Sequence, residues 1–123
     1  MDNPPRILVV DDHIGILLLL QQRLTEAGYL VDTAASGEEG IKKVIARRPS
    51  LVLLDIKMPG LDGLTAMSEM LKIAPDLPVV MMSAYTEMDT VFRARREGLI
   101  RHYLEKPFDL NHVLDLVRKL LPP

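Results

Sequence analysis

The chain of 123 residues contains no cysteine, which excludes disulfides, thiol chemistry and cysteine-ligated metal sites. It also lacks a long apolar segment. The longest dense apolar run covers residues 14–20 and includes Gly15, whereas a helix that crosses a bilayer needs about 20 apolar residues. The first residues show no signal-peptide pattern. We therefore expect a soluble, cytoplasmic protein without a membrane partner.

A strong charge of either sign is missing as well. The formal net charge is −2, which is too small to indicate nucleic acid or an acidic membrane as the main partner. Apolar residues make up 48% of the chain and charged residues 26%, a balance typical of globular proteins rather than disordered ones. No internal repeat or composition shift divides the sequence. Residues 1–123 are therefore expected to form a single domain.

Five short apolar segments alternate with five helical patterns along the chain. We expect strands at residues 7–10, 29–33, 51–55, 78–82 and 101–105, and helices at residues 14–27, 36–48, 62–74, 86–98 and 109–121. Ser36 with Glu39 matches a capping box, and Thr86 with Asp89 repeats that pattern. This alternation favours parallel pairing with right-handed crossovers, and so predicts an α/β sheet covered by helices on both faces.

The central strand carries the most informative stretch. Four apolar residues, 51–54, run directly into Asp55, and Pro59-Gly60 then turns the chain. A continuous apolar run between such breaks is typical of a strand buried on both faces. Asp55 then lies at the carboxyl end of a central strand, where open α/β sheets bind ligands. Taken alone, however, Asp55 could equally well do no more than terminate the strand.

Other polar residues also follow apolar strands directly: Asp11, Asp12, Ser83 and Lys106. Because parallel strands end at the same edge of a sheet, we expect these four to converge on Asp55. Three adjacent carboxylates raise one another's pKa unless a cation compensates, and such oxygen ligands suit Mg²⁺. Carboxylates, Mg²⁺, an ammonium and a hydroxyl together suit a phosphoryl group. We expect no histidine in this site and find no glycine-rich phosphate loop, so nucleotide binding is not indicated.

Each of these residues also has a purely structural interpretation. Asp11 or Asp12 could cap the first helix, which is a common role for aspartate. Ser83 could belong to an ordinary turn after a strand, and Lys106 could be a solvated loop lysine. Taken singly, each structural interpretation explains its residue as well as the functional one does. All of them must be correct at once, however, to exclude a functional site at this edge of the sheet.

At this point the sequence closely resembles the receiver domains of response regulators, the phosphoacceptor modules of two-component signalling and phosphorelays. The resemblance covers the whole chain. It implies a flavodoxin-like (βα)5 three-layer fold with strand order 2-1-3-4-5, an order that comes from the family and not from the residue pattern. The matching motifs are Ile7-Leu8-Val9-Val10-Asp11-Asp12, Asp55-Ile56-Lys57-Met58-Pro59-Gly60-Leu61-Asp62-Gly63, Met82-Ser83-Ala84-Tyr85 and Tyr103-Leu104-Glu105-Lys106-Pro107-Phe108.

The resemblance implies a role for each matching position. Asp55 would accept the phosphoryl group from a histidine kinase or a histidine phosphotransfer protein. Asp12, Asp55 and the backbone carbonyl of Lys57 would ligate Mg²⁺, for which Mn²⁺ could substitute, and Asp11 would act mainly through water. Lys106 would bind the phosphoryl oxygens, and its bond to the following proline is expected to be cis.

The same family pattern implies a switch. Ser83 would turn toward the phosphate and vacate space for an aromatic side chain, changing the surface formed by the fourth helix, fifth strand and fifth helix. Ser83 and Lys106 are 23 positions apart, one more than is usual in the family. Counting back from Lys106 selects Tyr103 as the switch aromatic, and counting forward from Ser83 selects His102. We favour Tyr103, because a loop absorbs an insertion more easily than a strand does.

Three other features depart from the common pattern. Gly40 stands where alanine is frequent, which weakens that helix by about 1 kcal/mol. Ile14 and Leu18 lie off the apolar stripe of the first helix and either add to the core or dock a partner helix. Arginines 93, 95, 96 and 101 form a basic group that is either a solvated face or a site for an acidic partner.

The leading interpretation is a signalling module, not an enzyme, which catalyses only its own phosphorylation and dephosphorylation. A Mg²⁺-dependent phosphohydrolase is the second, but such enzymes usually place another acid where this chain has Lys57. A binding module that no longer uses phosphate is the third. The expected partners are the phosphodonor and either a downstream protein or a missing effector domain. We expect no direct contact with nucleic acid, and a monomer or a weak phosphorylation-dependent dimer.

Overall fold

The computed structural model describes residues 4–121, in which strands and helices alternate. A short 3₁₀ turn, Tyr85–Glu87, precedes the fourth helix. The sequence predicts each element to within two residues; differences of two residues occur at the end of the second helix, at both ends of the fourth helix and at the end of the fourth strand. The strands are β1 (Arg6–Val10), β2 (Leu30–Ala34), β3 (Leu51–Asp55), β4 (Val79–Ala84) and β5 (His102–Lys106), and the helices are α1 (Ile14–Glu26), α2 (Gly37–Ala46), α3 (Gly63–Ile73), α4 (Met88–Arg96) and α5 (Leu110–Leu120).

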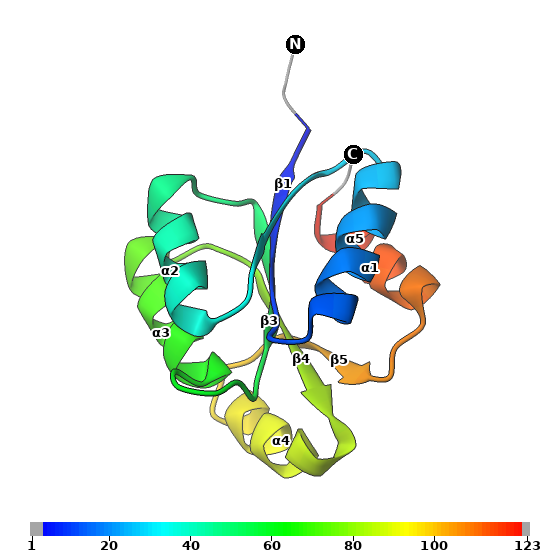
Figure 1. Ribbon diagram of the computed structural model, residues 1–123. Coiled ribbons are helices and arrows are strands. Elements are labelled where there is room, and N and C mark those ends of the chain that lie inside the picture. The colour runs from blue at the N-terminus through cyan, green and yellow to red at the C-terminus, as the bar shows by residue number, and fades with distance from the viewer. Residues whose placement is uncertain (1–3, 122–123) are drawn as a thin grey trace.

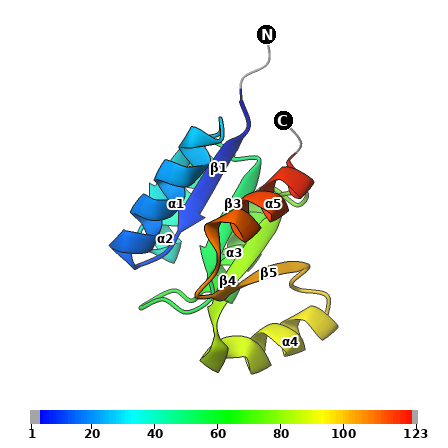
Figure 2. The same ribbon diagram turned by 90° about the vertical axis from the view of Figure 1, so that its right-hand side faces the viewer.

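All five strands pair in parallel in the order β2-β1-β3-β4-β5. The predicted flavodoxin-like fold, with its three layers, is therefore confirmed. Figure 1 shows the sheet between two helical layers, with α2 and α3 on one side and α1 and α5 on the other. Figure 2 views the α1 and α5 side, with β1, β3 and β4 behind these helices. The order places β3, which carries Asp55, at the centre of the sheet.

Alternation along the strands divides the apolar side chains into two cores. In β3, Val52 and Leu54 contact the core beneath α2, α3 and α4, whereas Leu51 and Leu53 contact the core beneath α1 and α5. All four side chains are fully buried, as expected for a strand covered on both faces. This burial holds the end of β3, and therefore Asp55, in a fixed position.

Local signals at the helix termini mostly act as the sequence indicates. The Ser36 hydroxyl accepts a hydrogen bond from the backbone N–H of Glu39, although the Glu39 carboxylate accepts from the N–H of Ala35 and not of Ser36. The predicted Thr86 cap is wrong. The Glu87 carboxylate instead accepts from the backbone N–H of Ala84, so the chain forms the 3₁₀ turn and α4 starts at residue 88.

Gly40 has a packing role that the sequence did not reveal. A Cβ at this position would lie 3.0 Å from a methyl group of Val10 and 3.1 Å from Cε of Met70. Glycine at this position lowers the helix propensity of α2, but it also allows α2 to pack closely against β1 and α3.

The first helix presents apolar side chains to solvent. Ile14 is 62% exposed, and Leu18 and Leu19 are similarly exposed, while Leu17, Leu20 and Leu24 form the buried stripe. The interpretation of Ile14 and Leu18 as additional core is therefore wrong. Within residues 4–121, no helix combines the length and apolar content required to cross a membrane.

Candidate functional site

The carboxyl edge of the sheet gathers the polar residues that follow the strands. Asp11 comes directly after β1, Asp55 is the last residue of β3, and Lys106 is the last residue of β5. In Figure 1 this edge is the lower one, where β1 leads into α1. Segments that are about 95 positions apart in the sequence thus meet because parallel strands share one edge.

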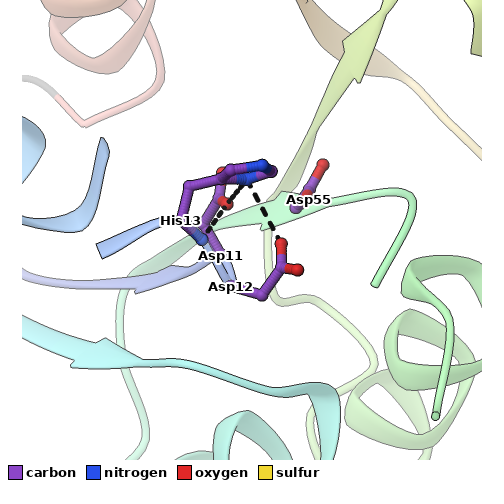
Figure 3. A group of neighbouring side chains, drawn as sticks. All are labelled: Asp11, Asp12, His13 and Asp55. Atoms are coloured by element: carbon purple, nitrogen blue, oxygen red, sulfur yellow. Dashed lines mark hydrogen bonds and ion pairs between the residues drawn. The ribbon is translucent and has the colours of Figure 1, made fainter. Parts of the chain in front are cut away.

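Three carboxylates and one imidazole form a tight cluster at this edge. Oxygen atoms of Asp11, Asp12 and Asp55 and a ring nitrogen of His13 all lie within 4.8 Å of one another. Figure 3 shows the four side chains turned toward one another, with His13 lying above Asp11 and Asp12. Asp11 and Asp55 are buried, whereas Asp12 is partly exposed. The cluster is therefore open to solvent on one side only.

Lys106 supplies the positive charge that opposes these carboxylates. Its Nζ donates a hydrogen bond of 2.8 Å to Oδ2 of Asp11 and lies 3.3 Å from Oδ1 of Asp55. Burial lowers the pKa of Lys106, but the hydrogen bond and charge of Asp11, with the charge of Asp55, more than offset this and raise the pKa above its ordinary value. Lys106 is therefore a stable cation held between the two buried acids. The bond from Lys106 to Pro107 is cis, as expected.

Asp55 is the electrostatically perturbed member of the cluster. Burial, followed by repulsion from Asp11, raises the pKa of Asp55 to about 6, although Lys106 acts in the opposite direction. One lysine thus does not compensate for the buried carboxylates. The remaining repulsion between the ionised carboxylates favours the binding of a further cation at this site.

His13 is the residue that the sequence interpretation missed. We expected no histidine in the site, yet Nδ1 of His13 donates a hydrogen bond of 2.8 Å to Oδ1 of Asp11 and lies 3.2 Å from Oδ1 of Asp12. The hydrogen bond with Asp11, and the charges of Asp11 and Asp12, raise the pKa of His13. The sequence feature that indicates His13 as a site residue is its position directly after two acids at the end of a strand.

The structural interpretation of the first two acids is only partly correct. Oδ1 of Asp11 accepts a hydrogen bond from the backbone N–H of His13, at the start of α1. His13 itself occupies the N-cap position, and its side chain makes no capping bond. Neither Asp11 nor Asp12 is therefore the N-cap of α1, and their carboxylates remain directed at the cluster.

The donor set fits a hard divalent cation. Oδ1 of Asp12 is buried but accepts no hydrogen bond within the described residues 4–121, because the nearby imidazole of His13 donates to Asp11. A buried oxygen without a partner is costly, and a metal ion would satisfy it. Lys57 lies two residues after Asp55 in the β3–α3 loop, and its own side chain is exposed.

The β3–α3 loop closes tightly behind Asp55. The backbone N–H of Gly63 donates a hydrogen bond of 2.9 Å to the carbonyl of Ile56, and a Cβ on Gly63 would lie only 2.3 Å from the carbonyl oxygen of Asp55. Gly60 turns the loop with a φ of 78°, a value that glycine adopts without strain. Only glycine at position 63 allows α3 to start this close to the acidic residue.

Ser83 lies on β4, next to β3, but its hydroxyl does not engage the acids. Met82 pairs with Asp55 in the sheet, and Ser83 is the following residue. The Ser83 side chain is fully buried, and Oγ donates a hydrogen bond of 3.3 Å to Sδ of Met88 in α4. The hydroxyl is thus held toward the first turn of α4.

Tyr103 and His102 face opposite sides of the sheet. Tyr103 pairs with Met81 and packs against the core beneath α2, α3 and α4, while His102 pairs with Val80. The Tyr103 ring meets Phe92 edge to face at 6.3 Å, and the Arg95 guanidinium lies 5.5 Å from its centre. Tyr103 is therefore the aromatic residue that contacts α4.

Comparison with known proteins identifies relatives over almost the entire chain. The profile of the response regulator receiver domain family matches residues 7–118. Sporulation initiation phosphotransferase F of Bacillus subtilis is 39% identical over 117 residues, covering 95% of this chain and 94% of the relative. The DNA-binding transcriptional regulator NtrC of Klebsiella pneumoniae is 35% identical, but there the match covers 92% of this chain and only 24% of the relative.

Solved structures agree with the sequence relatives. The receiver domain of NtrX from Brucella abortus superposes with a TM-score of 0.85 at 36% identity, covering 94% of this chain and 97% of that one. A CheY-like receiver domain protein from Methanospirillum hungatei superposes with a TM-score of 0.86 at 30% identity, covering 95% and 94% of the two chains. The likeness thus extends over the whole sheet and the helices on both of its faces.

Proposed function

The chain belongs to the response regulator receiver domain family, and from this we propose that it accepts a phosphoryl group on Asp55 in a Mg²⁺-dependent reaction. The donor is a histidine kinase or a histidine phosphotransfer protein. One observation carries the proposal: a buried carboxylate at the end of the central strand, with two further acids and Lys106 around it. This is the arrangement that phosphoryl transfer by positioning and charge neutralisation requires.

The protein's own residues supply most of the reaction. An ionised oxygen of Asp55 attacks phosphorus, the bond between phosphorus and the donor imidazole nitrogen breaks, and the imidazole leaves with the electron pair. Lys106, already 3.3 Å from Asp55, donates hydrogen bonds to the phosphoryl oxygens. A Mg²⁺ or Mn²⁺ ion held by Asp12, Asp55 and the backbone carbonyl of Lys57, with Asp11 acting through water, would neutralise negative charge on the acids and the phosphoryl group.

Phosphorylation changes the partner of the Ser83 hydroxyl. We propose that the Ser83 hydroxyl breaks its hydrogen bond to Sδ of Met88 and donates to a phosphoryl oxygen instead. This change moves β4 and the start of α4 toward the phosphate. Tyr103 then moves relative to Phe92 and Arg95, its contacts on α4. The surface formed by α4, β5 and α5 is the output of this switch, and phosphate shifts the population of two pre-existing states.

The exposed apolar side of α1 is the proposed docking site for the phosphodonor. Ile14, Leu18 and Leu19 are more than half exposed, and Leu19 borders an apolar groove of about 460 Å³ that reaches Lys106 and Phe108. A helix of the kinase or phosphotransfer protein that packs here lies next to the acids that receive its phosphoryl group.

A matched pair of variants tests this docking site. We expect Leu18→Lys to slow phosphoryl transfer from a protein donor at least tenfold, because a charge replaces buried contact area, and to leave phosphorylation by a small phosphodonor unchanged. Ile45→Lys, at an equally exposed position on α2, should affect neither reaction. Equal rates for the two variants with the protein donor would rule out docking on α1.

Enzymatic hydrolysis of an external substrate is the competing function. A phosphohydrolase that uses an aspartyl phosphate usually carries a second acid two positions after the nucleophile, and here Lys57 occupies that position with its side chain exposed. We therefore propose a signalling module that turns over only its own phosphate.

The same proposal covers organisation and partners. Residues 1–123 act as a single receiver domain in the cytoplasm, with no direct contact with nucleic acid or membrane, as a monomer or a weak phosphorylation-dependent dimer. The relatives suggest two outputs. The Bacillus subtilis relative has nearly this length, which fits transfer to a separate downstream protein, whereas NtrC is about four times longer, which fits an effector domain on the same chain.

Incubation with a small phosphodonor and Mg²⁺, followed by intact mass spectrometry, tests the proposed function. We expect a mass increase of about 80 Da that is lost when Mg²⁺ is chelated. The Asp55→Asn variant should show no increase, and Asp115→Asn, at an exposed position on α5, should react like the wild type. A binding module that no longer uses phosphate would show no increase in any of the three proteins.

A further inference from the structure

His13 combines a metal-binding side chain with a position inside the acidic cluster. Its Nδ1 lies 2.8 Å from Oδ1 of Asp11 and 3.2 Å from Oδ1 of Asp12. In an octahedral site with bonds of about 2.1 Å, neighbouring ligand atoms lie about 3 Å apart. Nδ1 of His13 and Oδ1 of Asp12, at 3.2 Å, therefore already have the spacing of two neighbouring ligands on one ion. Figure 3 shows the imidazole above the carboxylates of Asp11 and Asp12.

The imidazole is exposed to solvent, and its Nδ1 already faces the acids of the cluster. His13 stands at the N-cap of α1, but its side chain makes no capping bond, and its side chain is 64% exposed. Oδ1 of Asp11 accepts hydrogen bonds from Nδ1 and from the backbone N–H of His13, and Oδ2 of Asp11 accepts from Lys106. The buried Oδ1 of Asp12 accepts no hydrogen bond from residues 4–121 and lies 3.2 Å from Nδ1 of His13.

From this geometry we infer that His13 is a nitrogen ligand of the cation site, which gives the site a preference for transition-metal ions over Mg²⁺. The inference rests on the proposed function, because the carboxylate ligands are those assigned there. Carboxylate oxygens alone suit Mg²⁺ and Mn²⁺, whereas imidazole strengthens the binding of Co²⁺, Ni²⁺ and Zn²⁺. A divalent ion such as Co²⁺ would be held by Nδ1 of His13 together with Asp12 and Asp55, and its binding would release the Nδ1 proton to solvent.

Titration calorimetry with Mg²⁺ and Co²⁺ on wild type and His13→Gln tests the inference. Glutamine keeps a side chain of similar length but offers an oxygen in place of the nitrogen. We expect His13→Gln to weaken Co²⁺ binding about tenfold or more and to change Mg²⁺ binding less than about twofold. Pulsed electron paramagnetic resonance of bound Mn²⁺ should show a nitrogen coupling in the wild type that is absent in the variant.

Two control variants make the outcomes distinct. His112→Gln removes an exposed histidine on α5 and should leave both affinities unchanged. Asp12→Asn should weaken the binding of both ions, since it removes a ligand that both ions use. If Mg²⁺ binds in an Asp12-dependent manner but His13→Gln leaves the ratio of the two affinities unchanged, the inference about His13 is wrong and the proposed function stands. If Mg²⁺ binding does not depend on Asp12, the proposed cation site itself is wrong.

Discussion

Replacing Asp55 by asparagine should stabilise the metal-free protein. The buried Asp55 carboxylate is repelled by Asp11, and its pKa rises from 3.8 to about 6 on folding. A difference of about two units corresponds to roughly 2–3 kcal/mol of lost stability at neutral pH. Asparagine keeps the shape of the side chain and removes the charge. The free energy of unfolding of Asp55→Asn should therefore exceed that of the wild type by about this amount.

The pH dependence of this difference has a definite sign. The folded state holds the Asp55 proton more tightly than the unfolded state, so the penalty is fully present above pH 6, is lost as the pH falls, and is absent below pH 4. The advantage of Asp55→Asn should therefore shrink toward zero between about pH 7 and pH 4. Addition of Mg²⁺ should stabilise the wild type more than the variant.

Urea unfolding with a chelator present, followed by circular dichroism across this pH range, measures the effect. Asp115→Asn, which removes an exposed carboxylate from α5, is the control and should change stability by less than about 0.5 kcal/mol. The reasoning is refuted if Asp55→Asn is no more stable than the wild type at pH 7, or if its advantage is the same at pH 7 and pH 4.5.

Two further substitutions test the packing around the site. Gly63→Ala should lower the free energy of unfolding in urea by at least about 2 kcal/mol, because its Cβ would lie 2.3 Å from the Asp55 carbonyl oxygen. Gly15→Ala, which has open space around it, should instead stabilise the protein by about 0.5–1 kcal/mol through α1. Equal effects of the two substitutions on stability would contradict this expectation. Met88→Leu removes the acceptor of the Ser83 hydroxyl, so it should lower the free energy of unfolding by about 1 kcal/mol in the wild type and by less in a Ser83→Ala background. An equal loss of stability in both backgrounds would exclude that hydrogen bond.

Much of the fold could be predicted because its elements carry strong local signals. The run of residues 51–54 is apolar without interruption, and the structure buries it on both faces. Convergence of Asp11, Asp55 and Lys106 then followed from parallel topology alone, without any knowledge of side-chain contacts. The order of the strands did not follow from the residues, since several orders satisfy the same alternation, and it came from the family resemblance.

The errors came from interactions that are not local or that compete with a simpler pattern. Thr86 looked like a helix cap, but Glu87 binds the backbone first and forms a 3₁₀ turn. Gly40 read as a weak point in a helix because its neighbour Val10 is 30 positions away. His13 does not follow the strand directly, as Asp11 does, and its side chain joins the site because it turns back onto Asp11.

The position of the phosphoryl group on the chain decides whether Asp55 is the phosphoacceptor. After reaction with a small phosphodonor and Mg²⁺, borohydride reduction converts an aspartyl phosphate to homoserine, and peptide mass spectrometry identifies the modified residue. We expect homoserine at position 55 and at no other aspartate, including the neighbouring Asp11 and Asp12. Modification at another position, with Asp55 unchanged, would show that Asp55 is not the phosphoacceptor.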